Sequence, residues 1–387
     1  MWSADNAGMP KKLNDACSRS LSSCLPSVYP LALAVMLLPL GAWAQAAGEA
    51  PKLQDWRAAN DAVAQFKRGH IDLLKWESKN LPEVPAVPQT KPNLVLMAPA
   101  DVVRQAWRAH PELARVQSIL GADVVQRVAD GRLEAVDPSL QRRVDDMGEL
   151  LEVAADARKI WIEAVAARKA LRFRETALIS AEAGNELGAR MVSVGNWSPL
   201  QASPFQLTLS TARMDLSRAQ LAVAQADGAL LKLLKLAGTP AVLGLPSEFP
   251  EFPGEAMARE AWAQRLDALQ GQLPQMDAVQ NRVASQMAFD VYSTGHGLAR
   301  INRDEVLKVR RFITEETVLH YNGMLKSVWD LLGEVRNQAV AEIDAIDAER
   351  DFWRAEADLQ WTLQGGAPTK FVSLGGGSAD AGGPAAH

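Results

Sequence analysis

The chain has 387 residues, of which 48% are hydrophobic, 22% charged and 6% aromatic, with a formal net charge of −5. This mildly acidic balance argues against a nucleic-acid partner, which needs clustered cations to neutralise phosphates. The apolar fraction excludes a wholly disordered chain. With only 3 Tyr and 9 Phe, an all-β fold is disfavoured, because strands are enriched in aromatic and β-branched residues. We therefore expect an all-α protein.

Residues 1–44 are predicted to be a secretory signal peptide. A basic region precedes the apolar run 31–40, and Ala42-Trp43-Ala44 has the pattern of a cleavage site. The run is too short for an ordinary bilayer span, although an uncleaved membrane anchor is the alternative. Both cysteines, Cys17 and Cys24, precede the cleavage site. The mature chain is therefore expected to be exported and to lack disulfides and thiolate metal sites.

Proline divides the rest of the chain into two helical repeats. Residues 45–100 are predicted to be an N-terminal segment with a proline-rich linker, and residues 239–254 a second proline-rich linker. Proline is absent from 139–198, 205–239 and 275–367, which permits long helices. These limits predict repeats at 101–238 and 255–365. The Gly/Ala/Ser-rich residues 366–387 are predicted to be a disordered tail.

The apolar residues after Phe205 alternate at intervals of four and three residues. This spacing is the heptad seam of a coiled coil, and its small alanines allow helices to approach closely. The seam contains Leu209, Ala212, Leu216, Ala219, Val223, Ala226, Leu230, Leu233 and Ala237. Similar stripes run through 160–181 and 328–361. Plain core packing is the simpler interpretation of each stripe.

Each repeat is predicted to contain a helical hairpin that reverses at glycine. The reversals are placed near 194–199, at Gly195, and near 321–327, at Gly323, because a reversal needs a residue that accepts positive φ. Ser198 is then an N-cap, with Pro199 at the first helical position. Roughly 40 residues of helix follow each turn, an arm of about 60 Å. Superposing Ser198 on Ser327 nearly aligns the turns and the terminal glycines 238 and 365, as expected of an internal repeat.

Enzymatic chemistry has no sequence support, so no catalytic residue, cofactor or metal site is predicted. The five histidines are dispersed, without an HxxxH or HExxH pattern. Neither a phosphate-binding glycine loop nor a GxSxG elbow is present. One acidic cluster is a candidate: Asp344, Asp347 and Asp351 share a helical face. Its simpler interpretation is a solvated flank with Arg350 offsetting charge, and its functional one is a lumen wall that favours cations.

These features resemble the TolC-like outer-membrane efflux proteins. The resemblance covers about residues 53–365 and is carried by two segments, 190–200 at the first tip and 319–332 with 350–357 in the second repeat. The second set is similar to the branch found with copper-resistance oxidases. The resemblance implies two long antiparallel coiled-coil hairpins, three chains around a twelve-helix tunnel, and tips that dock a periplasmic membrane-fusion adaptor joined to an inner-membrane pump. It also implies an outer-membrane or periplasmic location and a role in metal, including copper, or drug export.

The resemblance also predicts which residues meet the adaptor. The expected tip surface consists of Gly195, Asn196, Ser198, Leu200, Gly323, Ser327, Asp330 and Leu331. Strand hairpins of the family's membrane barrel would fall near 130–152 and 265–285, but neither region shows the alternation that such strands require. The strand-like pieces are 94–97 and 371–374. A periplasmic coiled-coil scaffold or binding protein without a pore is therefore the alternative function.

Overall fold

The computed structural model describes residues 93–374 apart from 134–135, 138, 145 and 237–241. The predicted signal peptide, residues 45–92, Gly238 and residues 375–387 of the predicted tail lie outside this part of the chain. The described fold is all-α, as the sequence predicts. Its long helices are α7 (Met147–Ser193), α8 (Pro199–Leu233), α10 (Gln275–Ile301), α11 (Leu307–Asn322) and α12 (Val328–Thr362).

Two antiparallel hairpins make up this fold. The first joins α7 to α8, and the second joins the α10–α11 rod to α12. A π-helical turn at Asn302–Val306 connects α10 to α11 without breaking the rod. Helices α8 and α12 contain 35 residues each, slightly fewer than the expected length. Their equal lengths and shared position after a tip confirm the two-hairpin arrangement predicted from the repeat.

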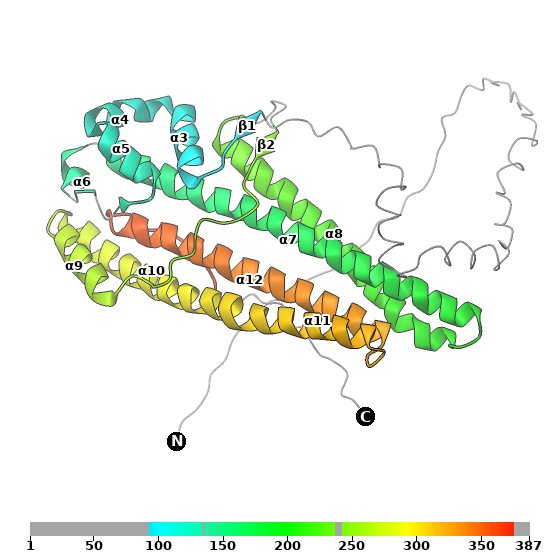
Figure 1. Ribbon diagram of the computed structural model, residues 1–387. Coiled ribbons are helices and arrows are strands. Elements are labelled where there is room, and N and C mark those ends of the chain that lie inside the picture. The colour runs from blue at the N-terminus through cyan, green and yellow to red at the C-terminus, as the bar shows by residue number, and fades with distance from the viewer. Residues whose placement is uncertain (1–92, 134–135, 138, 145, 237–241, 375–387) are drawn as a thin grey trace, which may run out of the picture. The chain divides into compact units, whose positions relative to one another are not determined.

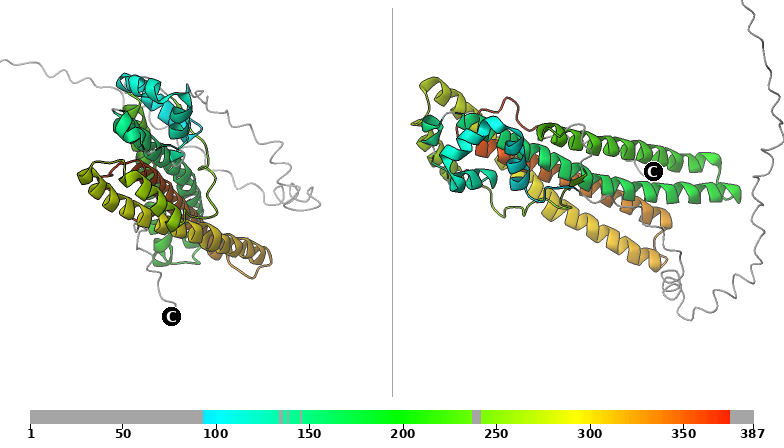
Figure 2. Two further views of the ribbon diagram at one scale, coloured as in Figure 1. Left: turned by 90° about the vertical axis from the view of Figure 1, so that its left-hand side faces the viewer. Right: turned by 90° about the horizontal axis from the view of Figure 1, so that it is seen from above.

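The long helices lie side by side in a fixed order. Helix α7 packs along both α8 and α12, and α12 packs in turn along α10 and α11. The order across the layer is therefore α8, α7, α12 and the α10–α11 rod, as two views show (Figures 1 and 2). Helix α8 forms one edge of this layer and the α10–α11 rod forms the other.

The predicted seam of α8 faces its neighbour. Leu209, Ala226 and Leu230 are buried, and the other described seam positions are half-buried. Most positions between them are exposed. The period of the sequence therefore identified the packed face of α8 correctly, because one stripe of a helix is buried against a single partner.

Short helices cover the end of the layer opposite the hairpin turns (Figure 1). They are α3 (Pro99–Ala109), α4 (Ala114–Leu120) and α5 (Ala122–Ala129). Two buried tryptophans hold this end together through indole hydrogen bonds. Nε1 of Trp107 donates to the Leu150 carbonyl at 3.1 Å, and Nε1 of Trp161 donates to the Leu96 carbonyl at 2.9 Å. The short α6 (Leu140–Arg143) leads into α7.

Regular β-structure in the described residues is limited to one parallel pair. Strand β1 (Leu94–Val95) places Leu94 opposite Leu243 of β2 (Leu243–Gly244). The strand-like segment 94–97 thus forms a strand over only two residues, and the strand expected at 371–374 does not form. The second linker then leads to α9 (Arg259–Gln270). Within the described residues, no helix is both long and apolar enough to cross a membrane.

Candidate functional site

The first tip is the turn of residues 194–198 between α7 and α8. Gly195 has φ +78°, which an L side chain adopts only with strain. The Asn196 and Trp197 amides both donate to the Met191 carbonyl, at 3.0 and 3.1 Å, and so satisfy the end of α7. Ser198 then caps α8 reciprocally with Gln201, and Pro199 begins the helix. The turn and cap predicted from the sequence are therefore present.

The second tip, residues 323–327, corrects one prediction. Gly323 has φ −82°, and Met324 is the residue with positive φ, at +60°. Both positive-φ residues lie three positions before the capping serine, so the repeat conserves the position of the turn and not its glycine. A non-glycine residue there costs about 1 kcal/mol. Ser327 caps α12 reciprocally with Asp330, and its hydrogen bonds lower the pKa of the Asp330 carboxyl.

Both tips present apolar side chains to solvent. Leu200 is 81% exposed and Met324 is 93% exposed, and Val194 and Leu325 are also largely exposed. Sequence reasoning identified Leu200 but missed the other three. The run Gly323-Met324-Leu325 in a predicted turn was a signal for exposed apolar side chains. Seven of the eight predicted tip residues are exposed, and Leu331 is half-buried against the hairpin. Exposed leucine and methionine at a helix reversal form the kind of patch that marks a protein contact.

Aromatic rings join the two hairpins beside their tips. Trp197 of the first tip stacks on Trp329 of α12 with a centroid distance of 4.7 Å. Phe205 of α8 contacts both, at 5.6 Å from Trp197 and 4.4 Å from Trp329. We call these three residues the aromatic clasp. Nothing in the heptad pattern pointed to it, because its members come from both hairpins.

The predicted acidic face lies in a crevice of about 620 Å³ between α10, α12 and residues 371–374. Asp344, Asp347 and Asp351 all line it, together with the guanidinium of Arg350. Arg350 binds Asp347 at 2.7 Å and Asp351 at 2.8 Å. Burial raises the pKa values of Asp344 and Asp347, although Arg350 offsets part of the shift at Asp347. The structure brings the three carboxylates together but pairs two of them with a cation.

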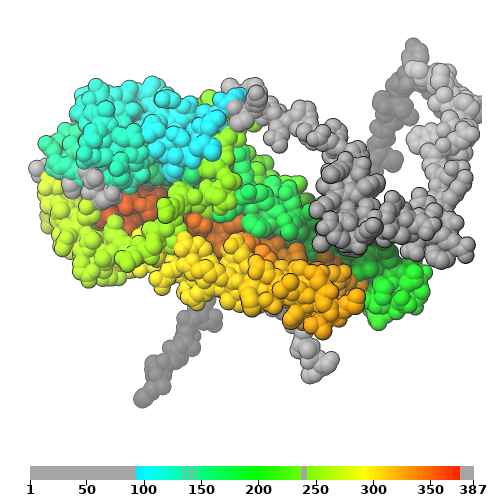
Figure 3. Space-filling model, viewed as in Figure 1, coloured from blue at the N-terminus to red at the C-terminus, as the bar shows by residue number. Residues whose placement is uncertain are grey.

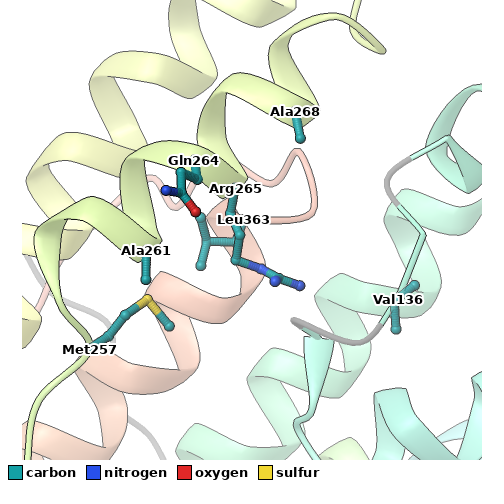
Figure 4. A pocket seen from close by; sticks show the side chains of 7 residues that line it. All are labelled: Val136, Met257, Ala261, Gln264, Arg265, Ala268 and Leu363. Carbon is teal, nitrogen blue, oxygen red and sulfur yellow. The ribbon is translucent and has the colours of Figure 1, made fainter.

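A second crevice, of about 520 Å³, lies at the end opposite the tips and is drawn in Figure 4. Its lining is mainly apolar. Figure 4 shows the side chain of Arg265 extending from α9 toward the loop that carries Val136. The lining residues are Val136, Met257, Ala261, Gln264, Arg265, Ala268 and Leu363. They include no nucleophile, carboxylate or imidazole, so they offer no acid–base chemistry. No group of three His, Cys, Asp or Glu residues suited to a metal ion occurs among the described residues.

The two edges of the helical layer carry exposed apolar stripes. On α8 the stripe repeats every seven residues through Leu200, Leu207, Met214 and Leu221. On the opposite edge a longer stripe follows the α10–α11 rod, and Figure 3 shows the α11 surface uncovered along the lower margin of that view. Its exposed members are Met276, Val279, Val283, Met287, Leu298, Ile301, Val309, Phe312 and Leu319. Heptad-spaced apolar residues on an uncovered helix face are the pattern of a helix-packing seam.

The chain is similar, at low sequence identity, to several solved structures of membrane proteins. No protein-family model and no curated protein sequence matches the chain. Among solved structures, the CmeC outer membrane channel of Campylobacter jejuni is 12% identical with a TM-score of 0.43, over 63% of this chain and 68% of that one. CusC is 12% identical with a TM-score of 0.42, over 70% and 92%. A membrane protein from Pseudomonas aeruginosa is 14% identical with a TM-score of 0.41, over 62% and 74%.

Proposed function

We propose that this chain is a passive component of an efflux assembly at the outer membrane or in the periplasm. Copies of the chain close into a ring through their helical edges, and the ring presents the paired tips to a periplasmic adaptor joined to an inner-membrane pump. The observation that carries this proposal is the pair of apolar stripes on opposite edges of one helical layer. The chain contributes a wall and a docking surface, without covalent chemistry.

The two edges differ in their apolar content, and we propose that each packs against the other. The α8 stripe has one apolar residue per heptad, between polar positions such as Thr211, Arg218 and Gln225. The α11 stripe is denser and includes Val309 and Phe312. A contact between two different surfaces is heterologous, and it forms a closed ring when the rotation between copies closes. By the resemblance to the efflux family, we propose three copies, whose helical layers together form one tube.

The tips are proposed as the adaptor contact. An adaptor of this kind presents a helical hairpin, and exposed leucine and methionine at helix ends fit into the groove of such a hairpin. The reciprocal cap keeps the first turn of α8 helical at the surface, so that helical backbone presents Leu200. In the second tip, the Leu325 amide donates to the His320 carbonyl at 2.8 Å. The proposed docking surface therefore needs no movement of the hairpins.

Disulfide trapping tests the ring. In a chain with Cys17 and Cys24 replaced by serine, Phe312→Cys is combined in turn with Leu207→Cys, Met214→Cys and Leu221→Cys. We expect one pairing to give a cross-linked ladder that ends at a closed trimer by native mass spectrometry, while each single variant gives no dimer. A single variant that dimerises would show a two-fold contact instead. A chain that stays monomeric at micromolar concentration would favour the periplasmic scaffold.

Docking is tested by binding the full chain to an immobilised adaptor hairpin. Leu200→Asp and Met324→Asp are expected to abolish binding, because each places a charge in the apolar contact. Ile119→Asp is the matched control, since Ile119 is also exposed but lies on α4 at the opposite end. Binding that survives both tip substitutions would refute the proposed contact.

A further inference from the structure

The aromatic clasp lies near the start of both helices that leave the tips. Trp197 immediately precedes the capping residue Ser198, and Trp329 follows the capping residue Ser327 by two positions. Phe205 lies on α8 and bridges the two indoles. The rings thus connect the backbone that carries Leu200 to the backbone that carries Met324 and Leu325.

Small residues on α7 make room for the clasp. A Cβ atom at Gly184 would lie 3.5 Å from Cδ1 of Phe205 and 3.7 Å from Cδ1 of Leu332. Alanine would make ordinary contact there, whereas a larger side chain directed at Phe205 would displace the ring. One helical turn away, Ser180 donates its hydroxyl to the Leu332 carbonyl at 2.9 Å, which brings α7 and α12 together. The remaining cavity measures only about 70 Å³, so the rings are held on several sides.

The ion pairs between the hairpins lie farther from the tips than the Ser180–Leu332 hydrogen bond does. Lys159 binds Asp358, and Glu163 binds Arg354, but these contacts lie toward the opposite end of α7 and α12. At a rise of about 1.5 Å per residue, the tip residues of α7 are roughly 45 Å beyond them along the helix. Small changes in the angle between the hairpins would therefore move the tips considerably unless a contact near the tips restrained them.

We propose that Trp197, Phe205 and Trp329 are positioning residues that hold the two tips at one spacing, so that a single adaptor hairpin contacts Leu200 and Met324 together. This inference rests on the proposed docking function. Binding through two linked patches raises affinity because the second contact is intramolecular, and that gain is lost when the geometry varies. Opening the clasp should therefore weaken docking without altering the residues that touch the adaptor.

The spacing is measured by pulsed electron paramagnetic resonance between spin labels at Ser193→Cys and Lys326→Cys, in the chain without its native cysteines. We expect one narrow distance distribution in the parent chain. Trp329→Ala, which removes a ring, and Gly184→Leu, which displaces Phe205, should both broaden it. Trp329→Phe keeps an aromatic ring and should restore a narrow distribution. Trp262→Ala removes a stacked ring at 4.8 Å from Phe289, far from the tips, and controls for general destabilisation.

Adaptor binding by the same variants completes the test. Trp329→Ala is expected to weaken binding about tenfold, with Trp329→Phe near the parent value and Trp262→Ala unchanged. A narrow distance distribution in Trp329→Ala and Gly184→Leu would overturn the clasp. A broadened distribution with unchanged affinity would overturn its positioning role. A parent chain that shows the narrow distribution but binds no adaptor would instead refute the proposed function.

Discussion

The ammonium of Lys159 on α7 lies 3.1 Å from Oδ1 of Asp358 on α12, and it joins the two hairpins across 199 residues of sequence. The two partners are not equivalent. The Asp358 side chain is only 3% exposed, whereas Lys159 is 20% exposed and also binds Asp156 at 3.1 Å. Burial raises the pKa of Asp358, and the Lys159 ammonium offsets part of that shift.

Removing the cation should therefore be worse than removing the carboxylate. Lys159→Met leaves a buried, unpaired Asp358 and is expected to lower the free energy of unfolding by about 3 kcal/mol. Asp358→Ala leaves Lys159 with Asp156 and with the Trp361 ring, 5.6 Å away, so we expect a smaller loss of about 1 kcal/mol. Urea denaturation at a fixed protein concentration measures both. The double variant Lys159→Met/Asp358→Leu should recover most of the stability, and equal losses in the single variants would contradict the asymmetry.

Gly366 fixes the turn that follows α12. A Cβ atom there would lie 2.3 Å from Nε1 of Trp361, and the Gly366 carbonyl accepts a hydrogen bond from Nδ2 of Asn281 at 3.0 Å. Gly366→Ala must displace the indole or the turn, and such overpacking costs about 1–3 kcal/mol. Hydrogen exchange should rise in residues 366–374.

Gly297 is the matched control for this substitution. It lies within α10, and no atom comes within 4 Å of the site of its Cβ. Gly297→Ala should stabilise the chain by roughly 0.5–1 kcal/mol through helix propensity. If the two alanine substitutions changed stability in the same direction, the steric argument at Gly366 would be wrong.

The two serine caps differ in one chemical respect. Ser198 pairs with the neutral Gln201, whereas Ser327 pairs with the acidic Asp330. Each serine-to-alanine substitution is expected to cost about 1 kcal/mol. The Asp330 pKa is lowered in the fold, so the stability it adds is present above its unfolded pKa and is lost as pH falls through the folded pKa.

Hydrogen exchange at the two tips, corrected for intrinsic rates, distinguishes the neutral Ser198–Gln201 cap from the acidic Ser327–Asp330 cap. At about pH 7 both serine-to-alanine variants should lose protection in the first turn of the affected helix. Toward about pH 3, the penalty of Ser327→Ala should shrink, while the penalty of Ser198→Ala should stay constant. A parallel response of both tips to pH would show that the Asp330 carboxylate does not contribute to the second cap.

Local sequence patterns were enough to predict the long helices, the location of both turns and the positive-φ residue of the first turn. The α8 seam follows from spacing alone, because residues four and three apart share a face whatever the partner is. Ser198 with Pro199 is likewise a local signal. The second turn was assigned correctly in sequence, but its positive φ falls on Met324 because the reversal keeps its distance from Ser327. Positive φ was predicted at Gly323 because glycine adopts it more readily than any other residue.

Contacts between the hairpins could not be predicted from such patterns. The aromatic clasp and the Lys159–Asp358 pair each depend on which faces of α7 and α12 meet, and a heptad stripe does not specify its partner. The π-helical turn at Asn302–Val306 likewise interrupts a stretch with no proline to mark it. The sequence also did not show which apolar helix residues are exposed. Phe312 lies on an open edge of the layer, whereas Leu209 is buried.

Glu349 lines a crevice of about 460 Å³ between the hairpins, together with Lys169, Glu248 and Arg303. Burial raises the pKa of its carboxyl, Lys169 and Arg303 oppose the shift, and Glu248 adds to it. A carboxyl with a raised folded pKa favours the fold most below its unfolded pKa, and that contribution is lost as pH rises through the folded pKa. Glu349→Gln should therefore stabilise the chain at about pH 7.5 and have little effect at about pH 4.

Urea denaturation of Glu349→Gln at both pH values measures the difference in stability. Glu305→Gln, on the exposed side of the π-helical turn, is the control. A Glu349→Gln chain that is less stable than the parent at about pH 7.5 would show instead that the ionised carboxylate is held by its neighbouring cations.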